Sequence, residues 1–172
     1  ASKRNDSVDS RKNFYLIAFI FTKNMKRIGI ISDTHNFLDE KVLEHFKEVD
    51  YIFHAVDIGT SAVTDTLKKN KTLIAVYGNI DGHELRQEFP ENQLVEIEGC
   101  KIFMTHIAGA AEYYNTRVQR ILKQEKPHIL ICGHSHIVKV MHDKKYRILH
   151  INSGAAGIHG FFKICLCFKS AI

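Results

Sequence analysis

The chain has 172 residues, of which 45% are hydrophobic and 25% are charged, values typical of a soluble globular domain with a buried core. Its net charge of +5 is concentrated near the start, because the first 25 residues hold five Lys or Arg against two Asp. The rest of the chain carries only +2 and has no basic, aromatic-rich stripe. This distribution counts against a long nucleic-acid substrate.

Residues 1–24 are predicted to lie outside the folded domain, as an extension without a role in the chemistry. They contain an apolar run at 14–21, but eight residues are too few to cross a bilayer, which requires about 20. No small-residue cleavage site follows this run, as a signal peptide would require. A membrane-associating leader and an extra strand remain open alternatives for this segment. One domain is predicted over 25–172, and its oligomeric state is not readable.

The cysteines and histidines give two further expectations. The four cysteines form no CxxC pair and no disulfide-like spacing, so we interpret them as reduced thiols. They are Cys100, Cys132, Cys165 and Cys167. Reduced thiols predict a reducing compartment, and we expect the cytoplasm. Eleven histidines are many for this length and suggest a metal site.

Strand and helix patterns alternate through the first half of the domain. β-Branched runs indicate buried strands, and spaced apolar stripes between them indicate helices. The predicted elements are strands at 27–32, 51–56 and 72–77 and helices at 38–49 and 61–69. In the second helix, Ala62, Val63 and Leu67 are expected to face inward. This order predicts parallel strands joined by right-handed crossovers.

The second half predicts hairpins around a single helix. Gly99 marks the turn of the first hairpin, Asn115 is the expected N-cap of the helix, and Pro127 stops it. The helix runs through Val118, Ile121 and Leu122, and the predicted strands are 94–98, 101–105, 128–132, 138–141, 146–151 and 161–168. Together the two halves predict an α/β domain with mixed pairing, in which two sheets lie between helical layers.

Side chains that can bind metal ions follow the predicted strands. Asp33 and His35 come directly after the first strand, where an extended chain would point both the same way. This pair alone also fits an ordinary polar turn. Later strands end in the same kinds of residue, namely Asp57, Asn79, Asp81, His106, His134 and His136. Since the carboxyl ends of parallel strands meet at one edge, we expect a shared site for two divalent ions, with Mn favoured over Fe, Ni or Zn.

These motifs resemble those of the calcineurin-like metallophosphoesterases, specifically the small single-domain phosphodiesterases of the YfcE type. The resemblance runs from about residue 25 to the C-terminus. It rests on Asp33-Thr-His35, Asp57, Gly78-Asn79-Ile-Asp81, Thr105-His106, Gly133-His134-Ser-His136 and Asn152-Ser-Gly154. The resemblance implies a four-layer αββα sandwich with two mixed sheets flanked by helices.

The resemblance also implies a binuclear centre that hydrolyses a small phosphodiester by attack of a metal-bridging hydroxide. Asp33, His35 and His136 would hold one ion, and the other would be held by Asn79, His106 and His134. Asp57 would bridge the two ions. The catalytic candidates are Asp57, Asn79 and Asp81, although Asp81 and His83 fit either a proton donor or a supporting role.

Three departures from the family pattern affect these expectations. Val56 stands where a Gly usually precedes the bridging Asp, and it would misplace Asp57 if the backbone there requires Gly. Ile80 replaces a His that acts on the leaving group in larger relatives, which favours activated or diester substrates. Ser153 replaces a common Pro, with a mild effect expected.

Other histidines are expected to have structural roles, and other functions compete with that of a phosphodiesterase. His45 is expected to face solvent, His54 to be packed rather than to bind metal, and His159 to lie in a loop that either approaches the site or does not. The main alternative function is a non-catalytic scaffold of the same fold that binds protein partners. A nuclease of the same superfamily is a third reading. Retention of all the expected ligands favours an enzyme.

Overall fold

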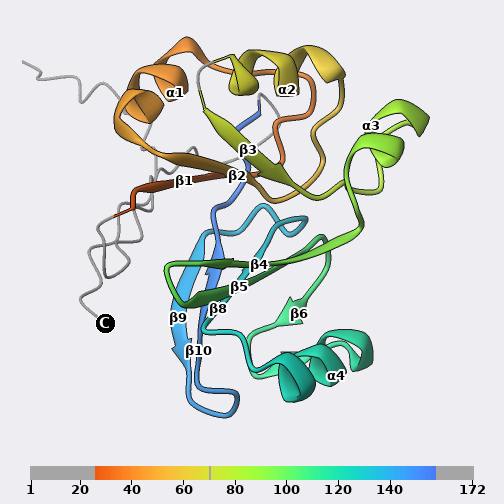
Figure 1. The fold of residues 1–172 in the computed structure, drawn as a ribbon. Helices are drawn as coiled ribbons and strands as arrows, with labels where there is room; N and C mark the ends of the chain where they lie inside the picture. Colours follow the sequence, from red (N-terminus) through yellow and green to blue (C-terminus); the bar gives the residue numbers. More distant parts are fainter. Residues whose placement is uncertain (1–25, 70, 158–172) are drawn as a thin grey trace, which may run out of the picture.

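The computed structural model describes residues 26–69 and 71–157. Four layers stack on one another, which confirms the predicted αββα sandwich (Figure 1). Helices α1 (Glu40–His45) and α2 (Ser61–Lys68) cover the outer face of the first sheet. The second sheet packs against the inner face of the first, and α4 (Thr116–Glu125) lies on its far side.

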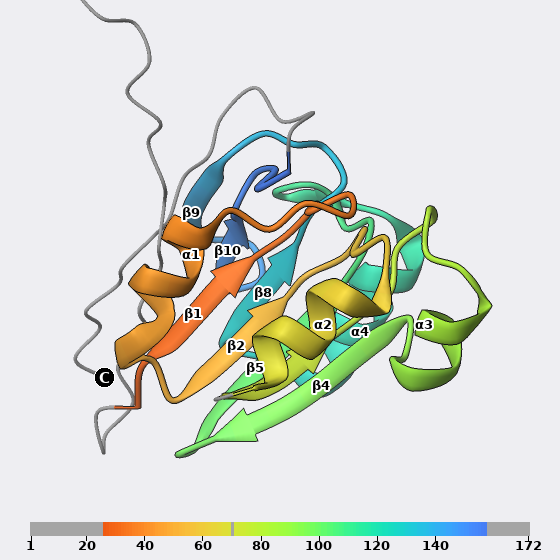
Figure 2. The same cartoon turned by 90° about the horizontal axis from the view of Figure 1, so that it is seen from above.

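The first sheet is parallel throughout its described strands. Its order is β1-β2-β3, with β1 at Ile28–Ile31, β2 at Tyr51–His54 and β3 at Thr72–Ala75. Ile30 lies opposite Phe53, and Phe53 lies opposite Ile74. Parallel strands place their carboxyl ends at the same edge, as the view from above shows (Figure 2). The loops that follow β1, β2 and β3 therefore start side by side.

The second sheet is mixed. Within the described residues its order is β4-β5-β8-β10-β9. The strands are β4 (Asn92–Ile97), β5 (Cys100–Thr105), β8 (Ile129–Cys132), β9 (Lys139–Asp143) and β10 (Ile148–Asn152). The central β5, β8 and β10 are parallel, while β4 and β9 pair antiparallel at the edges. The β4–β5 turn has Glu98 at φ 50° and Gly99 at φ 79°, the left-handed backbone that a two-residue hairpin requires.

Three apolar cores fill the spaces between the four layers. The first lies between the sheets and includes Ile30, Phe53 and Met104. The second joins α1 and α2 to the first sheet, and the third joins α4 to the second sheet through Val118 and Leu122. Asn115 caps α4 by accepting a hydrogen bond from Val118 N at 2.9 Å, as predicted from the sequence.

The structure differs from the expected elements in several places. The helix predicted over 38–49 begins at Glu40, capped by Asp39, and ends in a 3₁₀ turn at Phe46–Glu48. Ala62 is exposed, so its predicted inward orientation is wrong. Three elements were not expected, namely α3 (His83–Glu88), β6 (Gly109–Ala110) and β7 (Tyr113–Tyr114).

Two predictions fall on segments beyond the described part of the chain. These are the extension at 1–24 and the strand at 161–168. The loop that holds His159 lies outside it as well. Among the residues that are described, none of the helices is long and apolar enough to cross a membrane.

Candidate metal centre

The loops after β1 and β2 are held together by backbone hydrogen bonds that continue the parallel pairing. Asp33 N donates to Val56 O at 2.9 Å, and His35 N donates to Asp57 O at 3.0 Å. Both strands thus deliver their candidate ligands to one place. The backbone conformation differs from the prediction: Asp33 and His35 are not extended but left-handed, with φ values of 52° and 46°.

Six of the seven predicted ligands gather in two clusters where the edges of the two sheets meet. One cluster contains Asp33, His35 and His136, and the other contains Asp57, His106 and His134. Within each cluster, one potential ligand atom from each residue lies within 4.8 Å of the others. Both clusters draw on both sheets, since Asp33, His35 and Asp57 follow strands of the first sheet and the remaining histidines follow β5 and β8.

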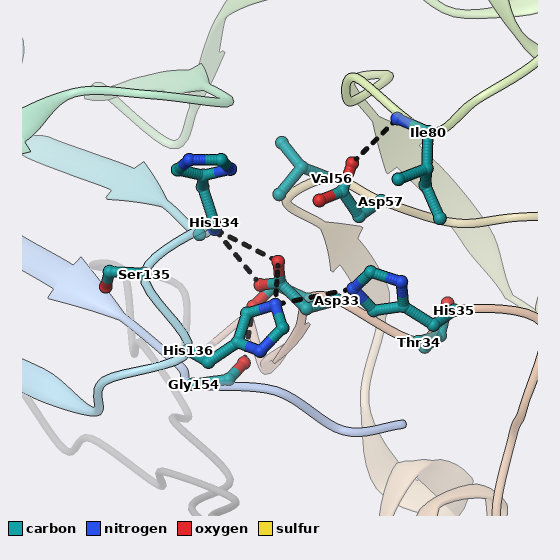
Figure 3. A network of polar contacts seen from close by, with 12 residues as sticks. Asp33, Thr34, His35, Val56, Asp57, Ile80, His134, Ser135, His136 and Gly154 are labelled. Atoms are coloured by element: carbon teal, nitrogen blue, oxygen red, sulfur yellow. Dashed lines mark hydrogen bonds and ion pairs between the residues drawn. The ribbon is translucent and has the colours of Figure 1, made fainter. Parts of the chain in front are cut away.

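In the first cluster, the ligand atoms point toward one another (Figure 3). His136 Nε2 lies 3.3 Å from Asp33 Oδ1 and 3.3 Å from His35 Nε2. Asp33 is fully buried and also accepts hydrogen bonds from His134 N at 3.0 and 3.3 Å. Burial and, to a smaller extent, the nearby Asp57 raise the pKa of Asp33, and its hydrogen bonds partly offset them, so that the pKa lies at about 6. A cation at this position would favour the charged carboxylate.

The second cluster contains a buried nitrogen with an unmet hydrogen-bonding need. His106 is 7% exposed, and in the described part of the chain its Nε2 makes no hydrogen bond. This atom lies 3.4 Å from Asp57 Oδ2, and the rings of His106 and His134 meet edge to face with centroids 4.7 Å apart. An orphaned buried polar atom is costly, so a ligand is expected to satisfy it. With a carboxylate and a second imidazole beside it, a divalent metal ion fits.

The pKa values in this cluster suit metal binding. Burial alone would raise the pKa of Asp57, but contact with His106 and the Ile80 N–H holds it below its ordinary value. Burial, together with the nearby His106, lowers the pKa of His134. A charged carboxylate and a neutral imidazole are the forms that bind metals.

Asn79 is the seventh predicted ligand and is exposed beside the second cluster. It lines, together with Gly78 and His106, a hollow of about 320 Å³. Arg86 fixes the turn before α3 by donating to Asn79 O at 3.1 Å and to Gly78 O at 3.2 Å. Asn79 therefore lies on the His106 side of the site, and its role as a ligand stays a prediction.

Asp81 is almost fully buried, and both of its carboxylate oxygens are occupied. Oδ1 accepts from Gly59 N at 2.7 Å, and Oδ2 accepts from Gly78 N at 2.7 Å and Ile58 N at 3.2 Å. Three backbone N–H groups therefore hold this side chain in place. This arrangement favours the supporting role for Asp81, as a brace between the loops after β2 and β3, over the role of proton donor.

Val56 has a φ of 123°, in the region that favours glycine. The backbone at this position thus has a conformation that favours Gly, the condition under which the sequence predicts that Val56 would misplace Asp57. Asp57 nevertheless lies within the second cluster, beside Val56 in Figure 3. The strain is held in place by hydrogen bonds on either side, from Asp33 N to Val56 O at 2.9 Å and from His35 N to Asp57 O at 3.0 Å.

We expect Val56→Gly to leave Mn²⁺ affinity within about threefold of wild type, because the backbone that places Asp57 is already fixed. Relief of strain, about 1–3 kcal/mol, opposes the loss of a buried side chain worth about 2 kcal/mol, so stability should change little. Calorimetric titration with Mn²⁺ and denaturant unfolding would measure both quantities. A large gain in Mn²⁺ affinity would show instead that Val56 misplaces Asp57.

His54 is buried beside the loops that carry the ligands. As predicted, it is packed in the interior and is not part of either ligand cluster. Thr34 Oγ1 donates to Ile58 O at 2.9 Å, so the 2.9 Å contact with His54 Nε2 requires that nitrogen to donate. Nδ1 is then free to accept from Val56 N at 3.4 Å. Burial lowers the pKa of His54 to about 4. The neutral ring is thus part of the support for the strained Val56 backbone.

The neutral state of His54 predicts a pH dependence of stability. The unfolded chain takes up this proton near pH 6.5 and the folded chain only near pH 4, so stability is complete above pH 6.5 and falls as the pH drops toward 4. The expected loss is about 3 kcal/mol. His54→Gln, whose amide can still donate to Thr34, should lack this component in urea unfolding series. Equal pH profiles of the free energy of unfolding for the two proteins would contradict the prediction. The titration of Asp33 does not affect the comparison, because both proteins contain this residue.

Sequence reasoning missed some supporting residues and one neighbouring surface. Gly78 packs against Asp57 so closely that an added Cβ would lie 1.9 Å from Asp57 Oδ1. Asn152 holds the loop of His134 by donating to Gly133 O at 3.0 Å. The motifs contained both residues, but their contacts cannot be read from spacing. Residues 107–111 lie beside His134, where both line one hollow.

A four-layer sandwich that joins two carboxylate–imidazole clusters at the edge of its sheets is the architecture of a metallophosphoesterase. The chain belongs to this class, because residues 25–167 match the family model of the calcineurin-like phosphoesterase superfamily domain. This match confirms the resemblance seen in the motifs.

Individual relatives agree with the family. The chain is 32% identical to a probable metallophosphoesterase of Methanocaldococcus jannaschii over 136 residues. This alignment covers 74% of the chain and 67% of the relative. It is 33% identical to a probable metallophosphoesterase of Methanothermobacter thermautotrophicus, over 63% of this chain and 66% of the relative. The chain thus spans about two thirds of the length of these curated relatives.

Solved structures share the fold. A novel archaeal phosphodiesterase superposes with a TM-score of 0.62 at 27% identity, covering 77% of this chain and 87% of that one. Vacuolar protein sorting 29 (Vps29) from Cryptosporidium parvum superposes with a TM-score of 0.62 at 20% identity, covering 76% and 74%. At 20% identity, the similarity to Vps29 shows a shared fold and nothing about function.

Proposed function

We propose that this phosphoesterase is a phosphodiester hydrolase with a binuclear metal centre. The observation that carries the proposal is the pair of adjoining clusters, one of which contains the buried and unsatisfied His106 Nε2. The clusters adjoin because His134, which belongs to the second, donates its backbone N–H to Asp33 of the first at 3.0 Å. This spacing supports two ions that share one substrate.

In the proposal, Asp33, His35 and His136 would hold one ion, Asn79, His106 and His134 would hold the other, and the carboxylate of Asp57 would be available to both. Divalent ions at these positions would make a water nucleophilic near neutral pH and offset charge on the phosphoryl oxygens. The chain itself fixes the ligands: Gly78 and the Ile80 N–H hold Asp57, and the N–H of His134 holds Asp33. Mn²⁺ is the proposed ion, because the set combines oxygen with imidazole ligands.

A diester is the proposed substrate because Ile80 offers no proton to a leaving group. It is 42% exposed at the site, and its N–H faces Asp57 Oδ1 at 3.4 Å. A poor leaving group would need protonation at this point, whereas an aryl or similarly activated ester does not. The likeness to an archaeal phosphodiesterase at 27% identity supports the same choice.

Hydrolysis of bis(p-nitrophenyl) phosphate, compared with p-nitrophenyl phosphate, tests the proposal. With Mn²⁺ we expect diester cleavage that a chelator abolishes and that exceeds monoester cleavage. Absence of diester turnover in the folded protein with Mn²⁺, Ni²⁺ and Zn²⁺ would overturn it. The two described cysteines, Cys100 and Cys132, are buried and free, which supports the further proposal that the protein works in a reducing compartment such as the cytoplasm.

A scaffold that binds protein partners is the second candidate function. It is favoured by exposed apolar side chains at Tyr113, 80% exposed, and Ile137, 65% exposed. The shared fold of Vps29 allows it but adds nothing about function. Metal-dependent turnover would decide for the enzyme, because a scaffold has no need of working ligands.

A further inference from the structure

A second hollow adjoins the candidate metal centre. It has a volume of about 340 Å³ and lies between residues 107–111 and the loop that carries His134. His134 belongs both to the wall of this hollow and to the second ligand cluster. A group bound in the hollow would therefore lie next to a phosphoryl group at the metal centre. We call this hollow the side pocket.

The walls of the side pocket are mainly apolar. Ala108 and Ala111 are buried in its lining, while Ile107 and Ile137 remain 42% and 65% exposed. Exposed isoleucines beside a pocket offer apolar area that a ligand can cover. Among the lining residues, Lys139 has the only permanent charge, and burial lowers the pKa of the lining His150 to about 4, so that its ring is neutral. Such a pocket favours an apolar group and disfavours a cation.

Ser135 supplies one directed polar group. Its Oγ accepts from Ile137 N at 3.3 Å and from Asn152 Nδ2 at 3.1 Å. With both lone pairs occupied, the hydroxyl proton remains as a donor. Figure 3 shows Ser135 on the side of its loop away from His35 and Asp57, and the residue lines the side pocket. An ester or ring oxygen can accept from it.

We propose that the side pocket binds the apolar arm of the substrate, a compact aryl or branched alkyl group esterified to the phosphate. This inference rests on the proposed function, since it names the kind of diester that the site accepts. The volume of the pocket, about 340 Å³, suits one ring or a short branched chain and not a polymer. It also gives a physical reason for Ile137 to remain exposed beside a metal centre.

Two non-hydrolysable probes test the pocket without relying on turnover. Phenylphosphonate and methylphosphonate present the same anion with a large and a small apolar arm, and calorimetry with the Mn²⁺-loaded full chain measures both affinities. Burying the ring should make phenylphosphonate bind at least about tenfold tighter. Ala110→Trp, which fills the pocket from an exposed position, and Ile137→Asn, which removes an apolar wall, should each reduce this ratio several-fold.

Leu94→Asn is the matched control, because Leu94 is 39% exposed on β4 and lies outside the pocket lining. It should keep the full phenyl-to-methyl ratio. Equal affinities, failure of both probes to bind, or a ratio that survives both pocket variants would overturn the inference. A preserved ratio without any diester hydrolysis would refute the proposed function and leave the pocket assignment standing. Diester hydrolysis without a higher affinity for phenylphosphonate would refute the pocket assignment and leave the proposed function standing.

Discussion

Asp57→Asn is expected to abolish diester hydrolysis and to raise the dissociation constant for Mn²⁺ by at least about 100-fold. Asp57 lies 3.4 Å from His106 Nε2, and its pKa is held below its ordinary value, so the charged carboxylate is the group that a cation meets. An amide of equal size keeps the packing and removes the charge. Steady-state rates with Mn²⁺ and calorimetric titration measure the two effects.

His45→Ala provides the control for this substitution. His45 is exposed on α1, which covers the outer face of the first sheet, and it belongs to neither ligand cluster. Its removal should change neither the rate nor the metal affinity. Wild-type activity in Asp57→Asn would contradict the role of Asp57 between the two ions.

Gly78→Ala is expected to reduce activity and metal affinity nearly as strongly, although it removes no ligand. A Cβ at this position would lie 1.9 Å from Asp57 Oδ1 and 2.6 Å from Asp57 N. Because backbone cannot yield as a flexible side chain does, Asp57 must move, and a shift of about 1 Å in a catalytic group can cost about 100-fold in rate. The rate with Mn²⁺ and the Mn²⁺ dissociation constant are the readouts.

Gly82→Ala is the matched control, since the same added methyl group meets nothing within 4 Å there. It lies four residues further along and should preserve rate, affinity and stability. If Gly78→Ala behaved like Gly82→Ala, the close packing of Gly78 against Asp57 would not be what positions the carboxylate.

Much of the fold was predictable because its signals are local. β-Branched runs predicted β1, β2 and β3 at nearly the observed bounds, and Asn115 and Pro127 bracketed α4 correctly. Short elements were not predicted because a six-residue helix such as α3 is too short to show a hydrophobic period. Ala62 was misplaced because a small apolar residue at the edge of a helical stripe is tolerated on either face.

The candidate site was predictable for a different reason. Parallel strands bring their carboxyl ends together, so Asp33 and Asp57 could be placed in one site from order alone. The local geometry could not be predicted in the same way. The left-handed backbone of Asp33, the occupied carboxylate of Asp81 and the side pocket all depend on contacts between residues distant in sequence. The ligand roles of the seven residues remain a prediction.

The backbone conformation of the proposed ligands has a consequence for the evolutionary history open to this fold. Five of them have positive φ values, namely Asp33 at 52°, His35 at 46°, Asp57 at 44°, His134 at 68° and His136 at 57°. A non-glycine residue in this conformation costs about 1 kcal/mol relative to glycine. The proposed ligands therefore lower the stability of the folded state. A mutation of one of these residues to Gly that ends metal binding therefore also relaxes the backbone. Loss of the exposed His134 side chain would for this reason cost little stability, whereas loss of the buried Asp33 would leave the His134 N–H without its acceptor. Evolutionary loss of the proposed metal site is therefore least costly at its exposed ligands.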